Sequence, residues 1–296
     1  MVSPAHKRKA VKLLVEEEGY SVRRACGYFL LNRASYDYEP IRPQDKHQRL
    51  LERIKALSWE NSRYGYRRIV ALLRQEGWTV SKKQVQRLRR LEGLRVKPPR
   101  KRERRQGKST GWVQRATHRH HVWSWDFIHD RTDNGGALKM LTLIDEYSKE
   151  CLAIKPARKL TSEDVLEVVQ KAVREHGAPE HLRSDNGSEF IAHIVQDWFR
   201  EHQIKTIYIE PGSPWQNGWI ESFHARLRDE CLNREVLLNL KEARVVIEDY
   251  RRHYNEKRPH SRLGYLSPAA WVQRQTSPDC VRPPASLRQS LSPTDN

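Results

Sequence analysis

Cysteine is scarce in this chain of 296 residues. Its four cysteines, Cys26, Cys151, Cys231 and Cys280, lie far apart, and none belongs to a C-x-x-C pair. The spacing therefore indicates neither a disulfide framework nor a cysteine zinc site. Because chains without disulfides are typical of reducing compartments, we expect a cytoplasmic protein.

Long apolar segments are absent as well. The sequence contains no run of about 18 apolar residues, the length that indicates a transmembrane helix. Its N-terminus also lacks the apolar core of a signal peptide. We therefore expect neither membrane spanning nor export.

Acidic residues are too few to balance the basic ones in the first third of the chain. Residues 1–110 hold 29 Lys+Arg against 11 Asp+Glu, whereas the remaining residues are neutral overall, so the net charge of +18 lies in this segment. A basic segment favours contact with phosphate backbones, and a solvated surface is the alternative for charge alone. The neutral remainder is long enough to bury a core of its own.

The basic segment is predicted to be helical in two parts. Residues 1–37 favour two or three short helices, with Ser21 as an N-cap, and form a candidate helix-turn-helix. A helical hairpin that packs on the rest of the protein is the alternative. Two prolines indicate a linker over 37–48, and residues 38–96 as a whole are predicted to form a second helical domain of helix-turn-helix type.

The second helical domain contains a basic helix that begins near Ser81. Ser81 and Gln84 form a capping-box pattern, which satisfies backbone N–H groups at the start of a helix. Val85 and Leu88 are predicted to face inward. This arrangement leaves the basic side chains on the outer face of the helix.

The outer face of this helix suits a DNA groove, because no acidic residue occurs between Ser81 and Leu91. Gln86 or Arg89 is expected to be free to reach base edges, and the other basic side chains to contact phosphates. A face that is merely solvated is the alternative. The residues of this helix that we expect to contact DNA are Lys82, Lys83, Gln86, Arg87 and Arg90.

Three segments complete the division of the chain. We expect a basic, proline-marked linker at 97–111, which follows phosphates between domains. Residues 112–274 are expected to form a folded domain. Residues 275–296 are expected to be a disordered tail.

The folded domain begins with three predicted strands. In residues 121–130 polar and aliphatic residues alternate with three aromatic ones, which predicts a strand with Asp126 near its centre. Two strands over 138–148 and 151–155 follow as a meander after a strong turn signal. A helix over 161–176 comes next, with an N-cap at its first residues.

Strands then alternate with helices. One strand is predicted before Asp185 and another at 204–210. Three antiparallel strands followed by this alternation predict an α/β sheet with helices on both faces. The helix between the last two strands is predicted to bury Ile191, Ile194, Val195, Trp198 and Phe199.

Three carboxylates occupy distinctive places in these elements. Asp126 lies in mid-strand among aromatic residues, where an uncompensated charge is costly to bury, so we expect a compensating cation or an open cleft. Asp185 follows a short apolar run, and Glu221 lies at the edge of the apolar stripe of a helix that starts near Ile220. Three carboxylates on two strands and a helix would suit a pair of Mg²⁺ ions.

Other acidic residues and several histidines have structural interpretations. Asp145 and Glu146 are interpreted as the end of a strand and a turn, and Asp130 and Asp133 as turn residues. The histidines that precede the first strand lack cysteine partners at ligand spacing. On this ground we do not expect a zinc site at His118, His120 and His121.

The order and spacing of the acids resemble a known family. Asp126 is followed by Asp185 within SDNGSEF and by Glu221 within SPWQNGWIESF, with 35 residues between the last two. This pattern is similar to the DDE triad of the retroviral-integrase superfamily, and most similar to insertion-sequence transposases of the OrfB type. The segment YNEKRPHSRLGYLSPAAW at 254–271 resembles the C-terminal signature of that family, so the resemblance covers most of the chain.

The resemblance implies a fold and an activity. The fold would be an RNase H-like α/β integrase catalytic core with C-terminal helices at 112–274, preceded by an all-α helix-turn-helix DNA-binding region. The activity would be metal-dependent DNA strand cleavage and strand transfer by a DDE transposase, a polynucleotidyl transferase. An RNase H-like nuclease without strand transfer and a repressor that only binds DNA are the alternatives.

The resemblance also implies roles for the site residues. Asp126 would bridge two Mg²⁺ or Mn²⁺ ions, with Asp185 on one ion and Glu221 on the other. Gln216 and Asn217 would position their loop or bond to DNA. Satisfying nearby backbone groups is the alternative for these two residues.

The partners implied are DNA, as element ends and as target, and further copies of the chain on that DNA. An upstream OrfA product is a further partner, because the sequence shows no sustained heptads of the kind that OrfA supplies. No membrane partner is expected. The chain differs from retroviral integrases in lacking their N-terminal His/Cys zinc domain.

Overall fold

The computed structural model describes residues 4–37, 44–96, 115–185, 187–210 and 214–276. Contacts divide the chain into two compact units, Met1–Arg53 and Ile54–Asn296. The predicted linker at 97–111 lies outside the described residues. Of the tail predicted at 275–296, residues 277–296 also lie outside the described residues, whereas 275 and 276 belong to a helix, so the predicted start of the tail was wrong by two residues.

The first unit contains the predicted short helices. They are α1 (Pro4–Glu16), α2 (Val22–Tyr28) and α3 (Arg33–Tyr36). Their core is formed by Val11, Ala25 and Cys26, with partly buried apolar residues packed around them. Ser21 occupies the predicted N-cap position of α2, although its side chain accepts no capping hydrogen bond there.

The next helix begins earlier than predicted. Helix α4 spans Gln44–Glu60, so the linker predicted to extend to residue 48 was wrong at its C-terminal end. A proline restricts mainly the residue before it, so Pro43 permits a helix to start directly after it.

Helices α5 (Tyr66–Gln75) and α6 (Lys82–Leu91) follow as predicted. Gly77, at a φ of 86°, lies in the turn between them, a backbone conformation that favours glycine. The Gln84 N–H donates to Ser81 Oγ at 3.1 Å, which supplies the N-cap half of the predicted capping box. Val85 is fully buried, so α6 keeps its predicted inner face.

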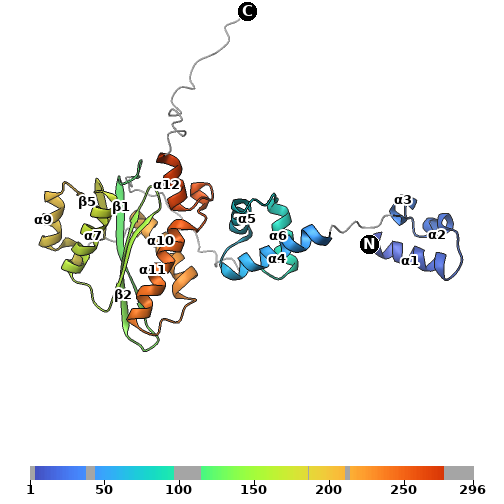
Figure 1. Ribbon diagram of the computed structural model, residues 1–296, viewed down its shortest axis with the longest axis horizontal. Coiled ribbons are helices and arrows are strands. Elements are labelled where there is room, and N and C mark those ends of the chain that lie inside the picture. Colours follow the sequence, from blue (N-terminus) through green and yellow to red (C-terminus); the bar gives the residue numbers. More distant parts are fainter. Residues whose placement is uncertain (1–3, 38–43, 97–114, 186, 211–213, 277–296) are drawn as a thin grey trace, which may run out of the picture. The chain divides into compact units, whose positions relative to one another are not determined.

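A five-stranded sheet organises the remainder of the second unit (Figure 1). Its strand order is β3-β2-β1-β4-β5. The first three strands pair antiparallel as the predicted meander, and β4 and β5 join in parallel beside β1. The strands are β1 (Val122–Arg131), β2 (Ala137–Asp145), β3 (Cys151–Ala157), β4 (His181–Ser184) and β5 (Lys205–Tyr208).

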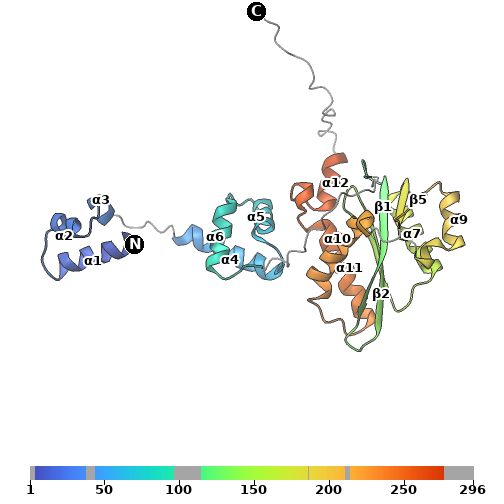
Figure 2. The ribbon, with the colours of Figure 1, turned by 180° about the vertical axis from the view of Figure 1, so that it is seen from behind.

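Helices cover both faces of the sheet, as predicted (Figure 2). The aromatic side of β1, with Trp123 and Trp125, packs under the first group of helices. The opposite side, with Ile128, packs under the second group. The first group is α7 (Ser162–His176), α8 (Ser188–Ile191) and α9 (His193–Glu201), and the second is α10 (Gly218–Leu227), the π-helical turn η2 (Arg228–Leu232) and α11 (Leu240–Glu256).

The other described elements are short or terminal. The 3-10 turn η1 (Pro214–Asn217) leads directly into α10, and η3 (Ser261–Leu263) follows α11. Helix α12 (Pro268–Thr276) ends the described chain.

One helix was predicted incorrectly. The stripe from Ile191 to Phe199 is divided, because Ala192 has an extended backbone (φ −57°, ψ 138°) between α8 and α9. The break changes the helical register. Val195 and Phe199 are buried as expected, but Ile191 and Ile194 are 50% and 45% exposed.

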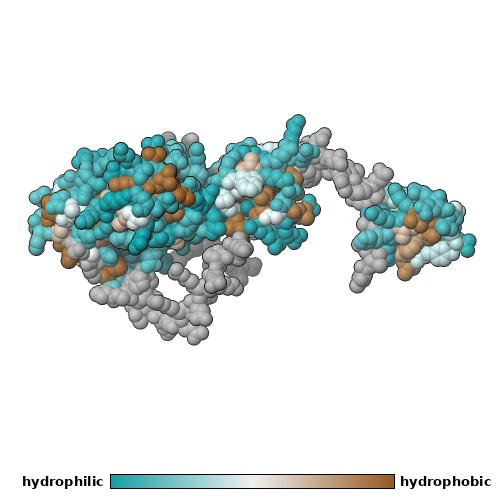
Figure 3. All heavy atoms as spheres, turned by 90° about the horizontal axis from the view of Figure 1, so that it is seen from below, coloured by the Kyte–Doolittle hydropathy of each residue, from teal (hydrophilic) through white to brown (hydrophobic). Residues whose placement is uncertain are grey.

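The surface is mainly hydrophilic, as expected for a sequence without long apolar segments. On the face drawn in Figure 3, hydrophilic residues predominate, and apolar residues form small separate patches. Across the part of the chain that the structure describes, each helix is too short or too polar to span a bilayer.

The capping box of α7 provides a test of local stability. Thr161 Oγ accepts from the Asp164 N–H at 3.3 Å, and Asp164 Oδ2 accepts from the Thr161 N–H at 3.0 Å. Thr161→Ala removes one half of this exchange and should lower the free energy of unfolding by about 1 kcal/mol in urea denaturation. Thr79→Ala, at an exposed loop position, is the matched control; equal losses in the two variants would contradict the capping role.

Candidate active site

The fold brings the three predicted carboxylates to one side of the sheet. Asp126 lies in mid-β1, Asp185 follows the last residue of β4, and Glu221 lies in the first turn of α10. Strands β1 and β4 are parallel neighbours. The charges of Asp185 and Glu221 both raise the pKa of Asp126, so the three carboxylates are electrostatically coupled. We refer to them as the acidic triad.

Asp126 is partly buried, with 26% of its side chain exposed. Burial, opposed by a hydrogen bond from the Phe127 N–H to Oδ1 (2.7 Å) and reinforced by the other two carboxylates, raises its pKa to about 7. A carboxyl group with this pKa lacks a compensating positive charge. Binding of a cation would favour its ionised form.

His224 is a neighbour of Asp126 that sequence reasoning missed. Its Nδ1 lies 3.8 Å from Asp126 Oδ2, and its Nε2 lies 2.7 Å from Thr142 Oγ1. Because the Thr142 hydroxyl donates to the Asp126 carbonyl oxygen (2.9 Å), it accepts from Nε2–H and leaves the Nδ1 lone pair toward Asp126. Burial lowers the pKa of His224 to about 4, so the ring is neutral at pH 7.

The position of His224 had one signal in the sequence. It follows Glu221 by three residues, and residues spaced this way lie on one face of a helix. Without the strand pairing that places Thr142 opposite Asp126, the signal could not be distinguished from an ordinary surface histidine.

Gly187 packs closely against Asp185 and Phe190. The Gly187 N–H donates to Asp185 Oδ1 at 3.1 Å. A Cβ atom at Gly187 would lie 3.1 Å from that oxygen and 3.2 Å from the ring of Phe190, tighter than ordinary contacts. Phe190 stacks on Trp125 with ring centroids 4.5 Å apart, so the aromatic side of β1 holds the Asp185 loop in place.

The acidic triad has the composition of a divalent-cation site. Among the described residues, none of its members forms an ion pair with a lysine or an arginine, and the nearby His224 is uncharged at pH 7. Burial, and to a smaller degree the charges of the other two carboxylates, raises the pKa of Asp126. Carboxylate oxygens are the ligands that Mg²⁺ and Mn²⁺ prefer, so the residues fit these ions.

Gln216 and Asn217 are both buried in the turn before α10. Gln216 Oε1 accepts from the Glu210 N–H at 2.9 Å, the backbone role given above as the alternative to contact with DNA. Asn217 Oδ1 is buried without a hydrogen-bond partner. The two side chains therefore differ, and Asn217 retains capacity for a further contact.

A basic and aromatic groove borders this turn. Two cations contact the partly buried Trp219 ring, with Lys149 Nζ 3.3 Å and the Arg262 guanidinium carbon 4.5 Å from its centroid. The groove has a volume of about 900 Å³, and Arg115 and Gln216 also line it. Cations beside an aromatic ring suit the backbone and bases of a nucleic-acid strand. Sequence reasoning missed this groove, because its residues come from separate segments.

The basic helix α6 presents its predicted outer face to solvent, but Arg89 does not belong to that face. Arg89 is 4% exposed, and burial lowers its pKa. The expectation that it is free to reach base edges was therefore wrong, because it lies one residue from Leu88 on the inward side. The exposed residues of the predicted set are Lys82, Lys83, Gln86, Arg87 and Arg90.

The rival acidic pair is structural, as predicted. Asp145 ends β2 and accepts hydrogen bonds from Ser148 Oγ and from the Tyr147 N–H. Glu146 is fully buried and forms an ion pair with Arg183 at 2.8 Å. A buried carboxylate that is already paired offers little to a metal ion.

Asp130 and Asp133 have different outcomes. Asp130 lies within β1, so its prediction as a turn residue was wrong; the strand extends to Arg131, where Arg228 approaches Asp130 at 3.9 Å. Asp133 lies in the turn after β1, as predicted.

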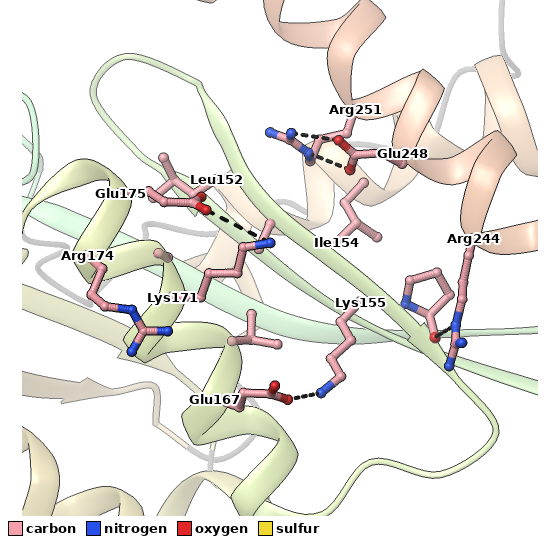
Figure 4. A pocket seen from close by; sticks show the side chains of 14 residues that line it. Leu152, Ile154, Lys155, Glu167, Lys171, Arg174, Glu175, Arg244, Glu248 and Arg251 are labelled. Carbon is pink, nitrogen blue, oxygen red and sulfur yellow. Dashed lines mark hydrogen bonds and ion pairs between the residues drawn. The ribbon is translucent and has the colours of Figure 1, made fainter.

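A separate pocket of about 440 Å³ lies at the edge strand β3, between α7 and α11 (Figure 4). Its charged side chains pair with one another: Lys155 lies 2.6 Å from Glu167, and Arg251 lies 2.8 Å from Glu248. No member of the acidic triad lines this pocket. We therefore do not interpret it as the active site.

Family models match three parts of the chain. Two models, each described as an integrase core domain, match residues 116–214 and 202–268. A third, described as an HTH-like domain, matches residues 45–102. Together they cover helices α5 and α6, the sheet and all members of the acidic triad.

Several curated relatives are similar over most of their length. The chain is 37% identical to an insertion element IS476 protein of Xanthomonas euvesicatoria, covering 92% of this chain and 78% of that protein. It is 36% identical to an insertion element IS407 protein of Burkholderia multivorans, covering 88% and 93%. It is 29% identical to the transposase for insertion sequence element IS904 of Lactococcus lactis, covering 77% and 95%.

Solved structures show a more distant likeness. The catalytic core domain of HTLV-2 integrase in complex with magnesium, in its trimeric form, is 19% identical with a TM-score of 0.45. The alignment covers 53% of this chain and 98% of that chain.

The raised pKa of Asp126 predicts pH-dependent stability in a metal chelator. Its folded-state pKa of about 7 lies above the ordinary value of 3.8. The stabilisation that the protonated Asp126 gives to the folded state is therefore fully present below about pH 4 and is lost as the pH rises through 7. Asp126→Asn should therefore raise the free energy of unfolding at pH 8, by up to about 4 kcal/mol, and by less at pH 5. Urea denaturation in EDTA at both pH values measures this difference.

The control for this measurement is Asp197→Asn. Asp197 is exposed on α9 and forms an ion pair with the exposed Arg200. This variant should show nearly the same small change at both pH values. If Asp126→Asn changed the free energy of unfolding equally at pH 5 and pH 8, the proposed raised pKa of a buried Asp126 carboxyl group would be contradicted.

Proposed function

The chain belongs to the integrase-core family of insertion-sequence transposases, and from this membership we propose the residues that perform its chemistry. The family gives it the RNase H-like core and the helix-turn-helix-like region that the sequence predicted. It is a polynucleotidyl transferase of the DDE type. We propose that Asp126, Asp185 and Glu221 are its catalytic carboxylates and hold two Mg²⁺ or Mn²⁺ ions.

One observation supports this assignment more than any other. Asp126, mid-strand and largely buried, feels the charges of both Asp185 and Glu221, and no lysine or arginine among the described residues pairs with any of them. A family resemblance alone would not require this arrangement. Mutual repulsion of three acids is tolerated in a folded protein where cations bind.

The proposed mechanism assigns a task to each side chain. When bound, the two ions would supply Lewis-acid chemistry that activates a water or a DNA 3′-hydroxyl and stabilises the leaving 3′-oxygen. Asp126, on which both other acids act, would take the central position. Asp185, whose Oδ1 accepts from Gly187 N–H, would hold one ion. Glu221, exposed at the start of α10, would hold the other.

His224 acts as a positioning residue in this proposal. It is held by Thr142, which itself bonds to the backbone of Asp126. A neutral ring at 3.8 Å limits the rotamers of the Asp126 carboxylate without neutralising it. Such support fixes a ligand geometry that cation binding would otherwise have to impose.

DNA is proposed to contact two surfaces. The outer face of α6 presents Lys82, Lys83, Arg87 and Arg90 without an acidic neighbour, as a helix in a DNA groove requires. The groove around Trp219 borders the turn that leads into Glu221, so a strand bound there would lie next to the acidic triad. Gln86, which is exposed, is the base-reading candidate on α6, whereas the buried Asn217 would position the turn rather than reach base edges.

The domain division, partners and location follow from the same proposal. We propose domains at 1–37, 38–96 and 112–274 joined by the 97–111 linker, which lies outside the described residues. Joining two element ends to one target requires more than one active site, so the chain acts as a homo-oligomer on DNA. It works in the cytoplasm, on nucleoid DNA, with an upstream OrfA product as a further partner.

Neutral replacements of the acidic triad test the chemistry. Asp126→Asn, Asp185→Asn and Glu221→Gln remove charge at nearly constant volume, so each should reduce cleavage and joining of end-containing DNA by at least about 10³-fold, while binding changes little. Products are separated on denaturing gels in Mg²⁺. Glu201→Gln, at an exposed position on α9, is the matched control and should retain full activity.

The products also distinguish the alternative functions. Joined strands support transposition, whereas cut strands without joining would indicate the nuclease instead. Substantial joining by any one of the three variants would remove that residue from the proposed site.

Single replacements on α6 test the DNA-binding proposal. Arg87→Ala and Arg90→Ala should weaken binding to end-containing and scrambled DNA alike, and each should reduce the salt slope of log K by about 1, as for a lost phosphate contact. Gln86→Ala should weaken binding to the end sequence only. Fluorescence anisotropy at several salt concentrations measures both effects.

Lys205→Ala is the control for the α6 variants. Lys205 is exposed on β5, far along the chain from the basic segment, and its loss should leave the affinity and the slope unchanged. Unchanged affinity in all three α6 variants would mean that this face is solvated, and α1 to α3 would become the better candidate.

A further inference from the structure

Four side chains meet at the start of β1 and β4, away from the acidic triad. His121 directly precedes β1, and His181 is the first residue of β4. The His181 N–H donates to the His121 carbonyl oxygen at 3.0 Å, and the Glu180 N–H donates to the His120 carbonyl oxygen at 2.9 Å. Asp185 follows the opposite end of β4, so these four side chains and the acidic triad lie toward opposite ends of the strand.

The ligand-type atoms of this group are close together. One such atom each from His121, Glu180 and His181 lies within 4.8 Å of the others. His118 joins them, since its Nε2 lies 2.7 Å from Glu180 Oε1. The His118 and His121 rings stack with centroids 4.8 Å apart. We refer to these four residues as the histidine cluster.

His181 has a buried ring nitrogen without a hydrogen-bond partner among the described residues. Its Nδ1 is buried and has no hydrogen-bond partner. Leaving a buried polar atom without a partner costs about 1 to 3 kcal/mol. The His181 ring also lies close to Glu180 and His121. A metal ion is one partner that could satisfy its nitrogen.

One ring nitrogen of His121 faces Glu180. Its Nδ1 accepts from the Thr117 N–H at 3.1 Å and lies 3.2 Å from Thr117 Oγ1, while its Nε2 lies 4.0 Å from Glu180 Oε2. A metal on Nε2 would replace the Nε2 proton; the ring would then carry its proton on Nδ1, lose the hydrogen bond from the Thr117 N–H and donate to Thr117 Oγ1 instead. Metal-binding histidines commonly have such a partner on the second nitrogen.

We propose that His121, Glu180 and His181, with His118 as a fourth ligand, bind one divalent transition ion of the Zn²⁺ class. Imidazole nitrogens favour Zn²⁺ over Mg²⁺, so this site and the acidic triad select different ions. In the absence of an ion, the ligand atoms are too far from one another for all of them to reach one Zn²⁺ ion at the usual Zn–N bond length of ~2.0–2.1 Å. Glu180, whose side chain is 56% exposed, and the His118 ring are free to move inward.

The proposed ion would join two separate parts of the chain. His118 and His121 belong to the segment through which the chain enters the core, and Glu180 and His181 belong to the start of β4. Bridging them closes a loop of about 60 residues, which restricts the unfolded chain in the manner of a cross-link. The ion would thereby anchor the entry of the catalytic core without taking part in its chemistry.

The sequence alone could not reveal this site. Three histidines before a strand lack cysteine partners, and Glu180 and His181 come some 60 residues later. Only the parallel pairing of Val122 with His181 brings the two segments together. His120 lies within the histidine run but outside the histidine cluster, since its Nδ1 accepts from Trp123 Nε1–H at 3.2 Å.

Zinc titration of the full chain tests the proposal. The experiment uses the Asp126→Asn, Asp185→Asn, Glu221→Gln background, which removes competition from the acidic triad, in excess Mg²⁺. Calorimetry with Zn²⁺ should give one ion per chain. His121→Ala, His181→Ala and the volume-conserving Glu180→Gln should each weaken binding by at least about tenfold.

The control and a second measurement keep the test decisive. His193→Ala, at an exposed position on α9 outside the cluster, should bind Zn²⁺ as the background does. Zn²⁺ should also raise the unfolding temperature of the background and of His193→Ala, but much less that of Glu180→Gln. Absence of Zn²⁺ binding, or equal affinity in the cluster variants and the control, would overturn the proposal.

Discussion

The burial of Asp126 beside two further carboxylates is the constraint on which the rest of this structure depends. Asp126 lies in the middle of a strand, and burial, together with the charges of Asp185 and Glu221, raises its pKa. Such an arrangement is costly unless the surrounding packing holds the acids in place. Trp125 and Phe190 stack on each other, Phe190 packs beside Gly187, and the buried stripe of α10 fixes Glu221. The hydrophobic core therefore holds three carboxylates in an arrangement that a bound cation would stabilise.

Charge is distributed unevenly along the sequence. Basic residues dominate the first third of the chain, whereas the core is neutral overall and concentrates its uncompensated acids at one place. Cations reappear next to that place around Trp219, where Lys149 and Arg262 flank the ring. A polyanion bound along these surfaces would meet the acids only through intervening divalent ions. This arrangement links DNA binding to metal-dependent chemistry.

Periodicity and residue type predicted the strands, the helices and the positions of the three acids, because each depends on local patterns. The errors have local causes that a pattern does not contain. The extended backbone of Ala192 divides a helix and exposes Ile194, and Arg89 is buried in a helix whose other arginines are exposed. His224 and the histidine cluster were missed because strand pairing, which joins residues distant in sequence, creates them.

The most direct test of the central claim is the number of Mn²⁺ ions held by the chain bound to end-containing DNA, followed by the electron paramagnetic resonance signal of free Mn²⁺. The account predicts two ions per active site in the unaltered protein. It predicts at least about tenfold weaker binding in Asp126→Asn, because Asp126 is assigned to both ions. Equal Mn²⁺ binding by the unaltered protein and by Asp126→Asn would contradict the account.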